Sequence, residues 1–417
     1  MAMARRGLFY TFLALYLREV LGLSVTATTL LASLTMIVNS FSQTFIWGRL
    51  SDKYQARTSL VVIGETIAAF GYIAVFFVHA YLLSIDGKIG AAYSIIAGLS
   101  ILEFFWSMSN LGWSALISDL TNSQERGRIM SLISSIGGVG RIVGISVSAI
   151  VYDWGGEGGG FKNGILFFFA SGIMLASAVI IWFSIHNSER IIHDSQDSKT
   201  IPNQSGELSK GVSSKNFYWL LVAMFVVGLG TYSILQILIF YVDLSSPIGA
   251  SSFDIAMIRN SASIATIFAS LVVGPLANKI GRRNTLGLGL VLTVVTPILY
   301  TLANNVVEMM IINSLSGVSM AILNVVGYLF ASDLIPPERR GRLFGRYNAV
   351  TYISFGVAGT FIGGPIADYL INAGLSKSTS YIATFQVASV ICFAGLVLYA
   401  LKVKSKPSPH ANDLENR

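Results

Sequence analysis

Gly48–Arg57 reads GRLSDKYQAR, and Gly274–Arg283 reads GPLANKIGRR. Each of these ten-residue stretches follows one long apolar run and precedes another. Each begins with Gly, has Lys in the sixth place and ends in Arg. A basic tight turn that recurs between apolar runs in both halves of a chain indicates a helical membrane protein built by duplication. Such proteins are most often solute transporters.

The composition excludes an ordinary soluble protein. Of the 417 residues, 53% are hydrophobic and only 12% are charged, about half the charged share of a typical soluble domain. The formal net charge of +7 makes nucleic acid a candidate partner. We exclude it, because Lys and Arg fall at the ends of apolar runs, where the membrane orientation rule puts them. The single cysteine, Cys392, lies inside an apolar run, and no signal-peptide cleavage pattern is visible.

Twelve stretches are apolar enough to cross a bilayer core, which needs about 20 residues per helix. They are 7–22, 25–48, 58–79, 91–117, 129–152, 164–185, 217–242, 252–276, 284–302, 306–331, 343–370 and 380–402. The longest polar stretch, His186–Asn216, separates six spans from six. We therefore expect an all-α membrane protein of two pseudo-symmetric six-helix bundles. The expected parts are a first bundle at 1–186, a cytoplasmic linker at 187–216, a second bundle at 217–404 and a cytoplasmic tail at 405–417.

Positive residues predict the orientation. With the N-terminus inside, 22 of the 28 Lys and Arg residues lie on the inner side and four on the outer side. We therefore expect a protein of the cell membrane with both termini in the cytoplasm. The first span is short, since only about 15 residues, roughly 22 Å of helix, separate Arg6 from Gly22, against a core of ~30 Å. Either Arg5 and Arg6 reach the inner headgroups, or the chain lacks an upstream piece of this helix, which we favour.

A second pair of loops, Glu125–Arg128 and Arg339–Arg342, also repeats, each before a Gly-rich run. Together the repeats resemble the major facilitator superfamily over essentially the whole chain. Its loop between helices 2 and 3 runs Gly-x-x-x-Asp-Arg/Lys-x-Gly-Arg-Arg/Lys. The first copy matches this pattern at Gly48, Asp52, Lys53 and Arg57 and departs from it at Gln55 and Ala56. The second copy matches it at Gly274, Lys279, Gly281, Arg282 and Arg283 and has Asn278 in place of Asp.

The resemblance implies a gating role for these loops. Asp52 would lie near the N-terminus of helix 11 in one state, where the helix dipole favours an anion, with Arg126 or Arg128 as its partner. Contacts made in only one state bias the inward–outward equilibrium. The alternative is that these residues only orient the loop. The predicted gating residues are Gly48, Asp52, Lys53, Arg57, Arg126, Arg128, Gly274, Lys279, Arg282 and Arg283.

Glycines recur inside two of the spans. Gly140-xxx-Gly144 and Gly359-xxx-Gly363 have the spacing of closely packed membrane helices. Pro365 removes a backbone donor and predicts a kink in the eleventh span. Exporters of the family often carry a Gly-Pro-rich motif in helix 5. Arg141 stands near where its Pro would be, which weakens an assignment as an exporter.

Four ionisable residues lie inside spans, namely Glu65, Glu103, Arg141 and Arg259, and such residues are functional candidates by default. The last three fall at nearly the same depth, and the resemblance implies that their helices line the central cavity. Glu65 lies nearer the inner end on a peripheral helix, so we expect a structural role and a pair with a cytoplasmic Arg. Glu103 and Arg141, on antiparallel neighbours, are predicted to pair.

This pairing would leave Arg259 without an acidic partner and the cavity with a net charge near +1. Such a cavity favours a substrate with a carboxylate or phosphate, which Arg binds bidentately. The alternative is a purely structural pair and an Arg259 that reaches toward the headgroups. Glu103 is the predicted proton carrier, because its protonation would respond to the cavity and to a competing anion.

Polar and aromatic residues complete the predicted substrate site. Each one alone is as readily explained by an interhelical hydrogen bond. They are Trp106, Asn110, Asn39, Gln43, Tyr232, Gln236, Asn313, Asn324, Asn348 and Tyr352.

We predict a secondary active transporter, not an enzyme, that moves a small organic solute by alternating access with coupling to protons. Neither HExxH nor Gly-x-Ser-x-Gly occurs in the sequence. Two substrates stay open: an organic anion, favoured by the charged residues, and lipophilic drugs moved by a proton-driven exporter, favoured by the aromatic residues. The expected partners are the bilayer, a small solute and the proton. We expect a monomer without cofactor, metal or nucleic acid.

Overall fold

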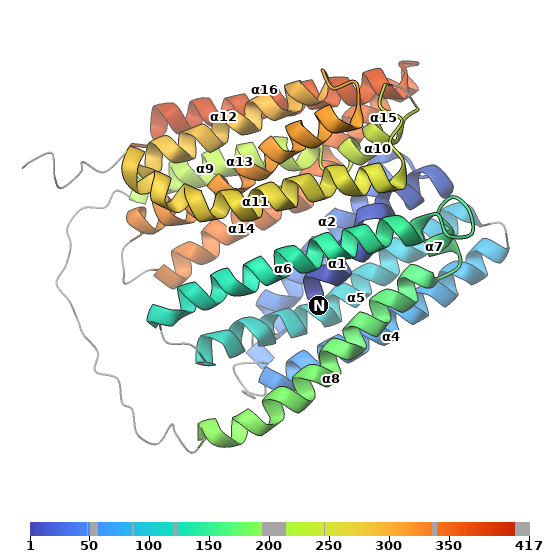
Figure 1. Ribbon diagram of the computed structural model, residues 1–417, viewed down its shortest axis with the longest axis horizontal. Helices are drawn as coiled ribbons and strands as arrows, with labels where there is room; N and C mark the ends of the chain where they lie inside the picture. The colour runs from blue at the N-terminus through green and yellow to red at the C-terminus, as the bar shows by residue number, and fades with distance from the viewer. Residues whose placement is uncertain are drawn as a thin grey trace, which may run out of the picture.

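The computed structural model describes residues 1–47, 49–50, 57–85, 87–120, 123–193, 214–245, 247–335 and 340–404. The regular elements within these ranges are helices, which run side by side in two groups (Figure 1). The first group holds α1 (Ala2–Leu15), η1 (Tyr16–Val20), α2 (Val25–Ser42), η2 (Gln43–Trp47), α4 (Arg57–Ser84), α5 (Lys88–Leu120), α6 (Ser123–Tyr152), α7 (Gly159–Lys162) and α8 (Ile165–His193). The second holds α9 (Ser214–Ser233), α10 (Ile237–Asp243), α11 (Ser252–Ile280), α12 (Arg282–Tyr300), α13 (Val306–Leu334), α14 (Arg340–Ala358), η5 (Gly359–Gly363), α15 (Gly364–Asn372) and α16 (Lys377–Lys402), where η denotes a π-helix.

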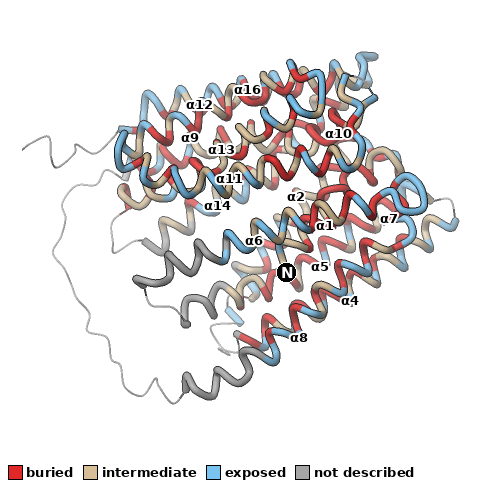
Figure 2. Tube along the Cα trace, viewed as in Figure 1, coloured by how far each residue is buried: buried red, intermediate tan, exposed pale blue. Residues whose placement is uncertain are grey.

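Eleven helices in the described ranges are long and apolar enough to cross a membrane, and they coincide with the predicted spans from 25–48 onward. The first predicted span is formed by α1 and η1, which carry four charged residues. Large apolar side chains such as Phe77, Phe268 and Val390 point outward from the helices and are exposed (Figure 2). A helical protein with apolar side chains on its outer faces fits a bilayer, where every backbone group must be paired within the helices. The predicted all-α fold is confirmed.

The start of α1 lies inside the bundle and not at its end (Figure 1). Met3 and Ala4 pack against Gly137, Gly140 and Gly144, midway along α6. The position of Arg5 at the inner headgroups, which was one sequence-based alternative, is therefore wrong: its side chain is 0% exposed. The short apolar run is explained by a charged side chain that is buried within protein.

The two predicted glycine pairs mark close helix contacts. A Cβ on Gly144 would overlap the carbonyl oxygen of Ala4, and one on Gly363 would overlap that of Ser233. Gly140 and Gly359 have looser surroundings, with the nearest atoms at 3.6 Å and 3.2 Å from the added Cβ. Close packing is confirmed at the second glycine of each pair. It fixes α1 against α6 and α9 against η5.

Gly144→Ala is expected to lower the melting temperature of the purified protein. The added methyl group must push α1 away from α6, and overpacking of this kind costs about 1–3 kcal/mol. Gly172→Ala in α8 is the matched control, because nothing lies within 4 Å of its added Cβ. A thermal unfolding curve checks both variants. Equal melting temperatures for the two would contradict the close contact.

The eleventh span is interrupted just before Pro365, as that residue predicts. The π-helix η5 separates α14 from α15, and Pro365 occupies the first turn of α15. Proline at this position lacks the N–H that a continuous helix would need, so the regular hydrogen bonding changes here. The seventh span is also divided, into α9 and α10, which the sequence analysis did not predict.

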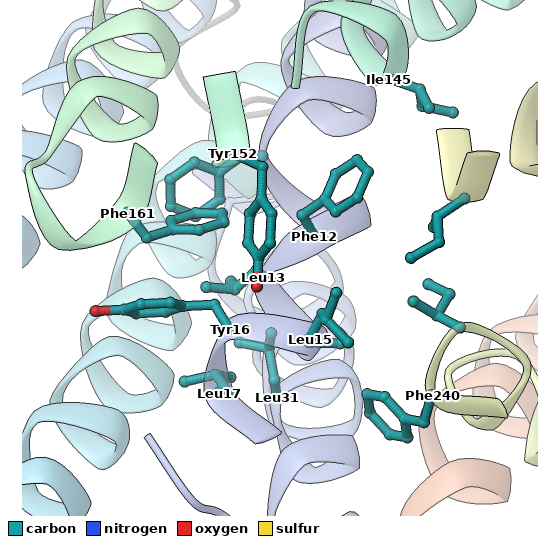
Figure 3. Close-up of a cluster of buried hydrophobic side chains, with 14 of the residues drawn as sticks. Phe12, Leu13, Leu15, Tyr16, Leu17, Leu31, Ile145, Tyr152, Phe161 and Phe240 are labelled. Atoms are coloured by element: carbon teal, nitrogen blue, oxygen red, sulfur yellow. The ribbon is translucent and has the colours of Figure 1, made fainter. Parts of the chain in front are cut away.

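Two apolar cores hold the helices together. One runs through the first half and continues into the second half at Phe240, Tyr241 and Phe385. Aromatic rings fill it, with Phe12 stacked on Tyr152 at 5.0 Å between ring centres (Figure 3). The other core lies entirely in the second half. The shared core therefore joins the two halves at one end of the molecule, the end of α1 that leads into α2.

Candidate functional site

Glu103 of α5 lies at the centre of a buried polar network in the first half. Its carboxylate accepts hydrogen bonds from Tyr10 Oη at 3.1 Å and from Asn39 Nδ2 at 2.8 Å. Gln43 Nε2 donates to Asn39 Oδ1 at 2.7 Å. The side chain of Glu103 is only 5% exposed. The structure thus brings together three of the predicted site residues, from α2, η2 and α5, and adds Tyr10 from α1.

Arg5 is the buried cation of this network, and the sequence analysis missed it. It donates to Tyr72 Oη, and its guanidinium lies 4.7 Å from the centre of the Trp106 ring. The charges of Glu103 and Glu65 both act on it. The predicted pair of Glu103 with Arg141 is not formed, because Tyr10, Asn39 and Arg5 surround the carboxylate instead. The signal was the first apolar run itself, which is too short for a span unless Arg5 lies within the membrane.

Glu65 of α4 is buried beside the same cation. It is 1% exposed and accepts a hydrogen bond from Ser109 Oγ at 2.7 Å. Its predicted arginine partner from the cytoplasmic side turns out to be Arg5, whose charge acts on Glu65 across the bundle without direct contact in the described part of the chain. Glu65 links α4 to α5.

Arg141 points toward the interior of the molecule. The lipid-exposed residues of α6 lie along one side of the helix, and they are Ile136, Val139, Val143 and Ile150. With about 3.6 residues per turn, Arg141 lies on the opposite side, although its side chain is itself exposed. It is therefore exposed to the space between the helices and not to lipid.

Arg259 of α11 points inward by the same argument. The exposed apolar residues of that helix, Ile264, Phe268 and Leu271, lie on the face opposite Arg259. Asn260 Nδ2 donates to Ser146 Oγ at 3.0 Å, so α11 packs beside α6 at this level. The charges of Arg259 and Arg141 act on each other. In the residues that the structure describes, neither guanidinium has a carboxylate within ion-pair distance.

A cavity of about 200 Å³ opens in the second half. It gathers the predicted residues Tyr232, Asn324, Asn348 and Tyr352 from α9, α13 and α14. Its other lining residues include Thr231, Thr351, Ser354, Tyr328 and Tyr347, and none of the lining residues is charged. The aromatic rings, hydroxyl groups and amides can contact a neutral ring with polar substituents.

The remaining predicted site residues lie elsewhere. Asn313 accepts from Tyr300 Oη at 2.7 Å and donates to the backbone oxygen of Ile258, so it joins α11, α12 and α13. Trp106 contacts both Arg5 and Arg6, each with its guanidinium 4.7 Å from the ring centre. Asn110 is half-buried on α5, and Gln236 precedes α10.

The predicted gating residues are only partly described. Gly48, Asp52 and Lys53, and the side chains of Arg57, Arg126 and Arg128, lie outside the described residues. In the second copy, Gly274 and Lys279 belong to α11. Arg282 forms an ion pair with Asp333 at 2.5 Å, and Arg283 donates to the backbone oxygen of Val403 at 2.8 Å. These arginines tie α12 to α13 and α16 within the second half.

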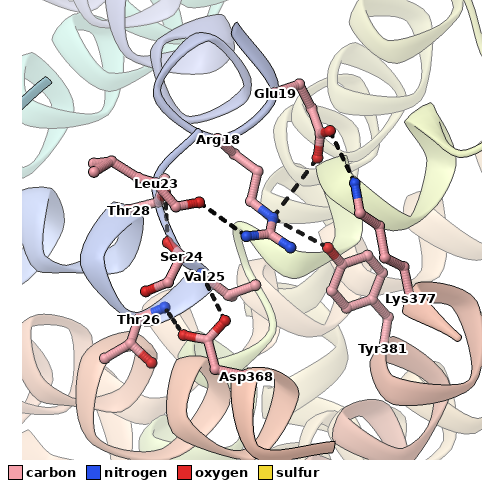
Figure 4. A network of polar contacts seen from close by, with 10 residues as sticks. All are labelled: Arg18, Glu19, Leu23, Ser24, Val25, Thr26, Thr28, Asp368, Lys377 and Tyr381. Atoms are coloured by element: carbon pink, nitrogen blue, oxygen red, sulfur yellow. Dashed lines mark hydrogen bonds and ion pairs between the residues drawn. The ribbon is translucent and has the colours of Figure 1, made fainter. Parts of the chain in front are cut away.

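Asp368 of α15 joins the halves at the N-terminus of α2 (Figure 4). Its two carboxylate oxygens accept from the backbone N–H groups of Val25 at 2.9 Å and Thr26 at 2.8 Å. These donors have no partner within their own helix, and the helix dipole favours a negative charge there. The contact resembles the one that the sequence implied for Asp52, but it lies at the opposite end of the molecule.

Other polar contacts between the halves lie in the same part of the structure. Lys377 donates to Glu19 at 3.1 Å, and Arg18 donates to Tyr381 Oη at 3.3 Å (Figure 4). The further hydrogen bonds between the halves join Ser33 to Thr360, Ser252 to Asp153 and Asn260 to Ser146. Within the described ranges, hydrogen bonds between the halves are thus confined to the half of the molecule that contains the α1–α2 connection. We call this set of contacts the closure.

Asp368→Asn is expected to weaken the closure. The amide can accept from only one of the two N–H groups and carries no charge, which forfeits about 0.3–2 kcal/mol. Spin labels at Lys162→Cys and Leu302→Cys, with Cys392→Ala, report the separation of the halves at this end. We expect the variant to populate a longer distance severalfold more. Asp254→Asn is the matched control, because Asp254 caps its own helix through Ser251; the same shift in both variants would rule out the proposed contact.

Comparison with known proteins is consistent with this architecture. The sequence model of the Major Facilitator Superfamily matches residues 1–246 and 237–417. An uncharacterized MFS-type transporter of Methanocaldococcus jannaschii is 27% identical over 38% of this chain and 40% of its own. The multi-drug resistance efflux pump PmrA homolog of Lactococcus lactis is 22% identical over 83% of this chain and 79% of its own. The isoprimeverose transporter of Lactiplantibacillus pentosus is 22% identical over 88% and 77%.

A solved structure shares the fold. A bacterial homolog of the human lysosomal transporter Spinster, in an inward-facing and occupied conformation, superposes with a TM-score of 0.70. The match covers 97% of this chain and 96% of that chain at 11% sequence identity. At this identity the likeness concerns the arrangement of helices alone.

Proposed function

The chain belongs to the major facilitator superfamily and is a secondary transporter, not an enzyme, and from this premise we propose that it moves a small organic anion by alternating access with coupling to protons. The observation that carries the proposal is the pair Arg141 and Arg259. They come from different halves and point inward, and no carboxylate lies within ion-pair distance in the described part of the chain. An uncompensated cation at this depth is costly. A substrate anion removes that cost, because Arg binds carboxylates and phosphates through two parallel hydrogen bonds.

Glu103 is the proposed proton carrier. Its hydrogen-bond donors, Tyr10 and Asn39, are neutral, so its charge is balanced only by Arg5 nearby. A carboxylate with such partners responds to any change in the surrounding charge. Binding of an anion at Arg141 and Arg259 favours the protonated form of Glu103, because two negative charges in one low-dielectric cavity repel each other. This couples the proton to the solute.

The proposed cycle uses the two halves as moving bodies, 1–186 and 217–404, joined by 187–216, with 405–417 as a tail. The positive residues support an orientation with both termini in the cytoplasm of a cell-membrane protein. In that orientation the closure faces outside, and its contacts break when the cavity opens outward. We propose that the transporter works as a monomer.

A second candidate is a proton-driven exporter of lipophilic compounds. The uncharged, aromatic cavity lined by Tyr232, Tyr328 and Tyr352 favours it. Similarity to a multi-drug efflux pump supports it as well.

A thermal-shift screen of the purified protein distinguishes these candidates. A ligand at 100 times its Kd adds about 2.7 kcal/mol of stability, which a melting curve resolves. The panel contains small carboxylates and phosphates, neutral sugars and lipophilic cations. Stabilisation by the anions is the expected result. Stabilisation by lipophilic or neutral compounds alone would replace the anion carrier by the second candidate.

A further inference from the structure

Arg6 is an inward arginine for which the proposed cycle has no use. It follows Arg5 on α1, and its guanidinium lies 4.7 Å from the centre of the Trp106 ring. The indole ring contacts the flat face of the guanidinium, and such stacking leaves the N–H edge free for a ligand. Within the described residues, Arg6 takes part in no ion pair.

Helix packing places Arg6 beside Arg141. The next residue, Gly7, is so close to α6 that a Cβ there would overlap the carbonyl oxygen of Arg141. The α-carbons of Arg6 and Arg141 therefore stand at nearly the same level. The charges of the two residues act on each other.

Arg259 stands slightly farther toward the closure. Asn260 meets Ser146, and Ile267 meets Gly138, so α11 runs antiparallel to α6 at this contact. The pairing puts Arg259 five to six residues, or about 8 Å along the helix axis, from Arg141. Two long arginine side chains can bridge this offset.

The balance of charges differs from the value near +1 that the sequence predicted. Arg5 and Arg6 add two positive charges at this depth, and Glu65 adds one negative charge. Together with Glu103, Arg141 and Arg259 they leave two positive charges uncompensated. The surplus belongs to Arg6, Arg141 and Arg259, because Arg5 is the cation on which both carboxylates act.

We propose that Arg6, Arg141 and Arg259 form a site for a doubly charged anion, and that a phosphate monoester is the class of solute it selects. This inference rests on the proposed anion transport and names its substrate more narrowly. A monoester carries a charge of about −1.5 to −2 at pH 7 and three acceptor oxygens, which matches the surplus and the donors of three guanidinium groups. A monocarboxylate leaves one cation unpaired. A phospholipid headgroup is a phosphodiester with one charge on phosphorus, so the site discriminates against it.

Binding of matched probes to the full-length purified protein tests this site. The probes are methyl phosphate, dimethyl phosphate and acetate, followed in a neutral detergent by the shift in melting temperature. Methyl phosphate is expected to bind at least about tenfold more tightly than the other two, since a hydrogen-bonded charge contributes about 1.5–3 kcal/mol. Its advantage should vanish at pH 5, where the monoester carries a single charge. Mixed micelles with phosphatidylglycerol should not compete.

Arg6 variants separate this inference from the proposed function. Arg6→Gln should remove the preference for methyl phosphate and leave acetate binding unchanged, and Arg6→Lys should keep most of the preference. Lys162→Gln, an exposed charge at the far end of the first half, should change neither. Equal binding of all three probes, equal loss of all three in Arg6→Gln, or competition by phosphatidylglycerol would overturn the phosphate site while leaving anion transport intact. No binding of any anion would overturn both.

Discussion

Arg141→Gln is expected to abolish stabilisation by anions and to reduce transport by about 100-fold. Arg141 lies between Arg6 and Arg259, so its removal leaves the anion without the central donor of the site. Removal of one partner from a buried hydrogen-bonded charge pair costs about 2–5 kcal/mol. The ligand-free protein should become more stable at the same time, because an uncompensated charge has been removed from the interior.

These two effects have opposite signs, which separates a binding role from a structural one. The melting temperature without ligand should rise, while the ligand-dependent shift disappears. Arg259→Gln should behave in the same way. Lys162→Gln, which also removes one positive charge, should show neither effect. A fall in the melting temperature of the ligand-free Arg141→Gln protein would show that the arginine has a structural partner, and would contradict an open anion site.

Glu103→Gln is expected to abolish proton coupling while solute exchange continues. Glutamine keeps the shape of the side chain and can still contact Tyr10 and Asn39, but it cannot release or take up a proton. One transported proton per solute sustains a concentration ratio of about tenfold per pH unit, since one unit is worth 1.36 kcal/mol. In proteoliposomes the wild type should build such a ratio under a pH gradient, and the variant should build none.

Counterflow of labelled solute without a gradient is the matching measurement, and it should stay within severalfold of the wild-type rate. Glu65→Gln is the control, because Glu65 is equally buried in the same half and is held by Ser109. It should lower the melting temperature and leave gradient-driven transport in place. Loss of coupling in Glu65→Gln and its retention in Glu103→Gln would move the proton site from α5 to α4.

Much of the fold could be predicted because the bilayer imposes simple rules. Long apolar runs must be helices, and the spans from residue 25 onward lie where hydropathy puts them. The Gly-xxx-Gly spacing located Gly144 and Gly363 at close contacts, because only a missing side chain permits such an approach. The interruption at Pro365 follows from its missing N–H.

The candidate site could be predicted only in part. Glu103, Asn39 and Gln43 meet as their helix positions suggested. Arg5 was missed because the orientation rule counts charges near span ends and does not detect a cation buried among Tyr72 and Trp106. The error also changed the expected partner of Glu103. Interhelical pairing depends on the rotation of each helix, which sequence depth alone does not give.

The outer contacts of Asp368 were likewise invisible in the sequence. Asp368 is one carboxylate near the end of a span, and its role depends on the N-terminus of α2, 342 residues earlier in the chain. A helix end recognises an acceptor by position and not by sequence motif. Contacts between halves of this kind need a structure.

The central claim is that arginines from both halves hold the transported anion. A structure by electron cryo-microscopy with the most stabilising anion from the screen tests it most directly. We predict density for the anion between the guanidinium groups of Arg141 and Arg259, with Glu103 still held by Tyr10 and Asn39. Density in the uncharged cavity beside Tyr232 and Asn324 instead, with both arginines free of the ligand, would contradict the account.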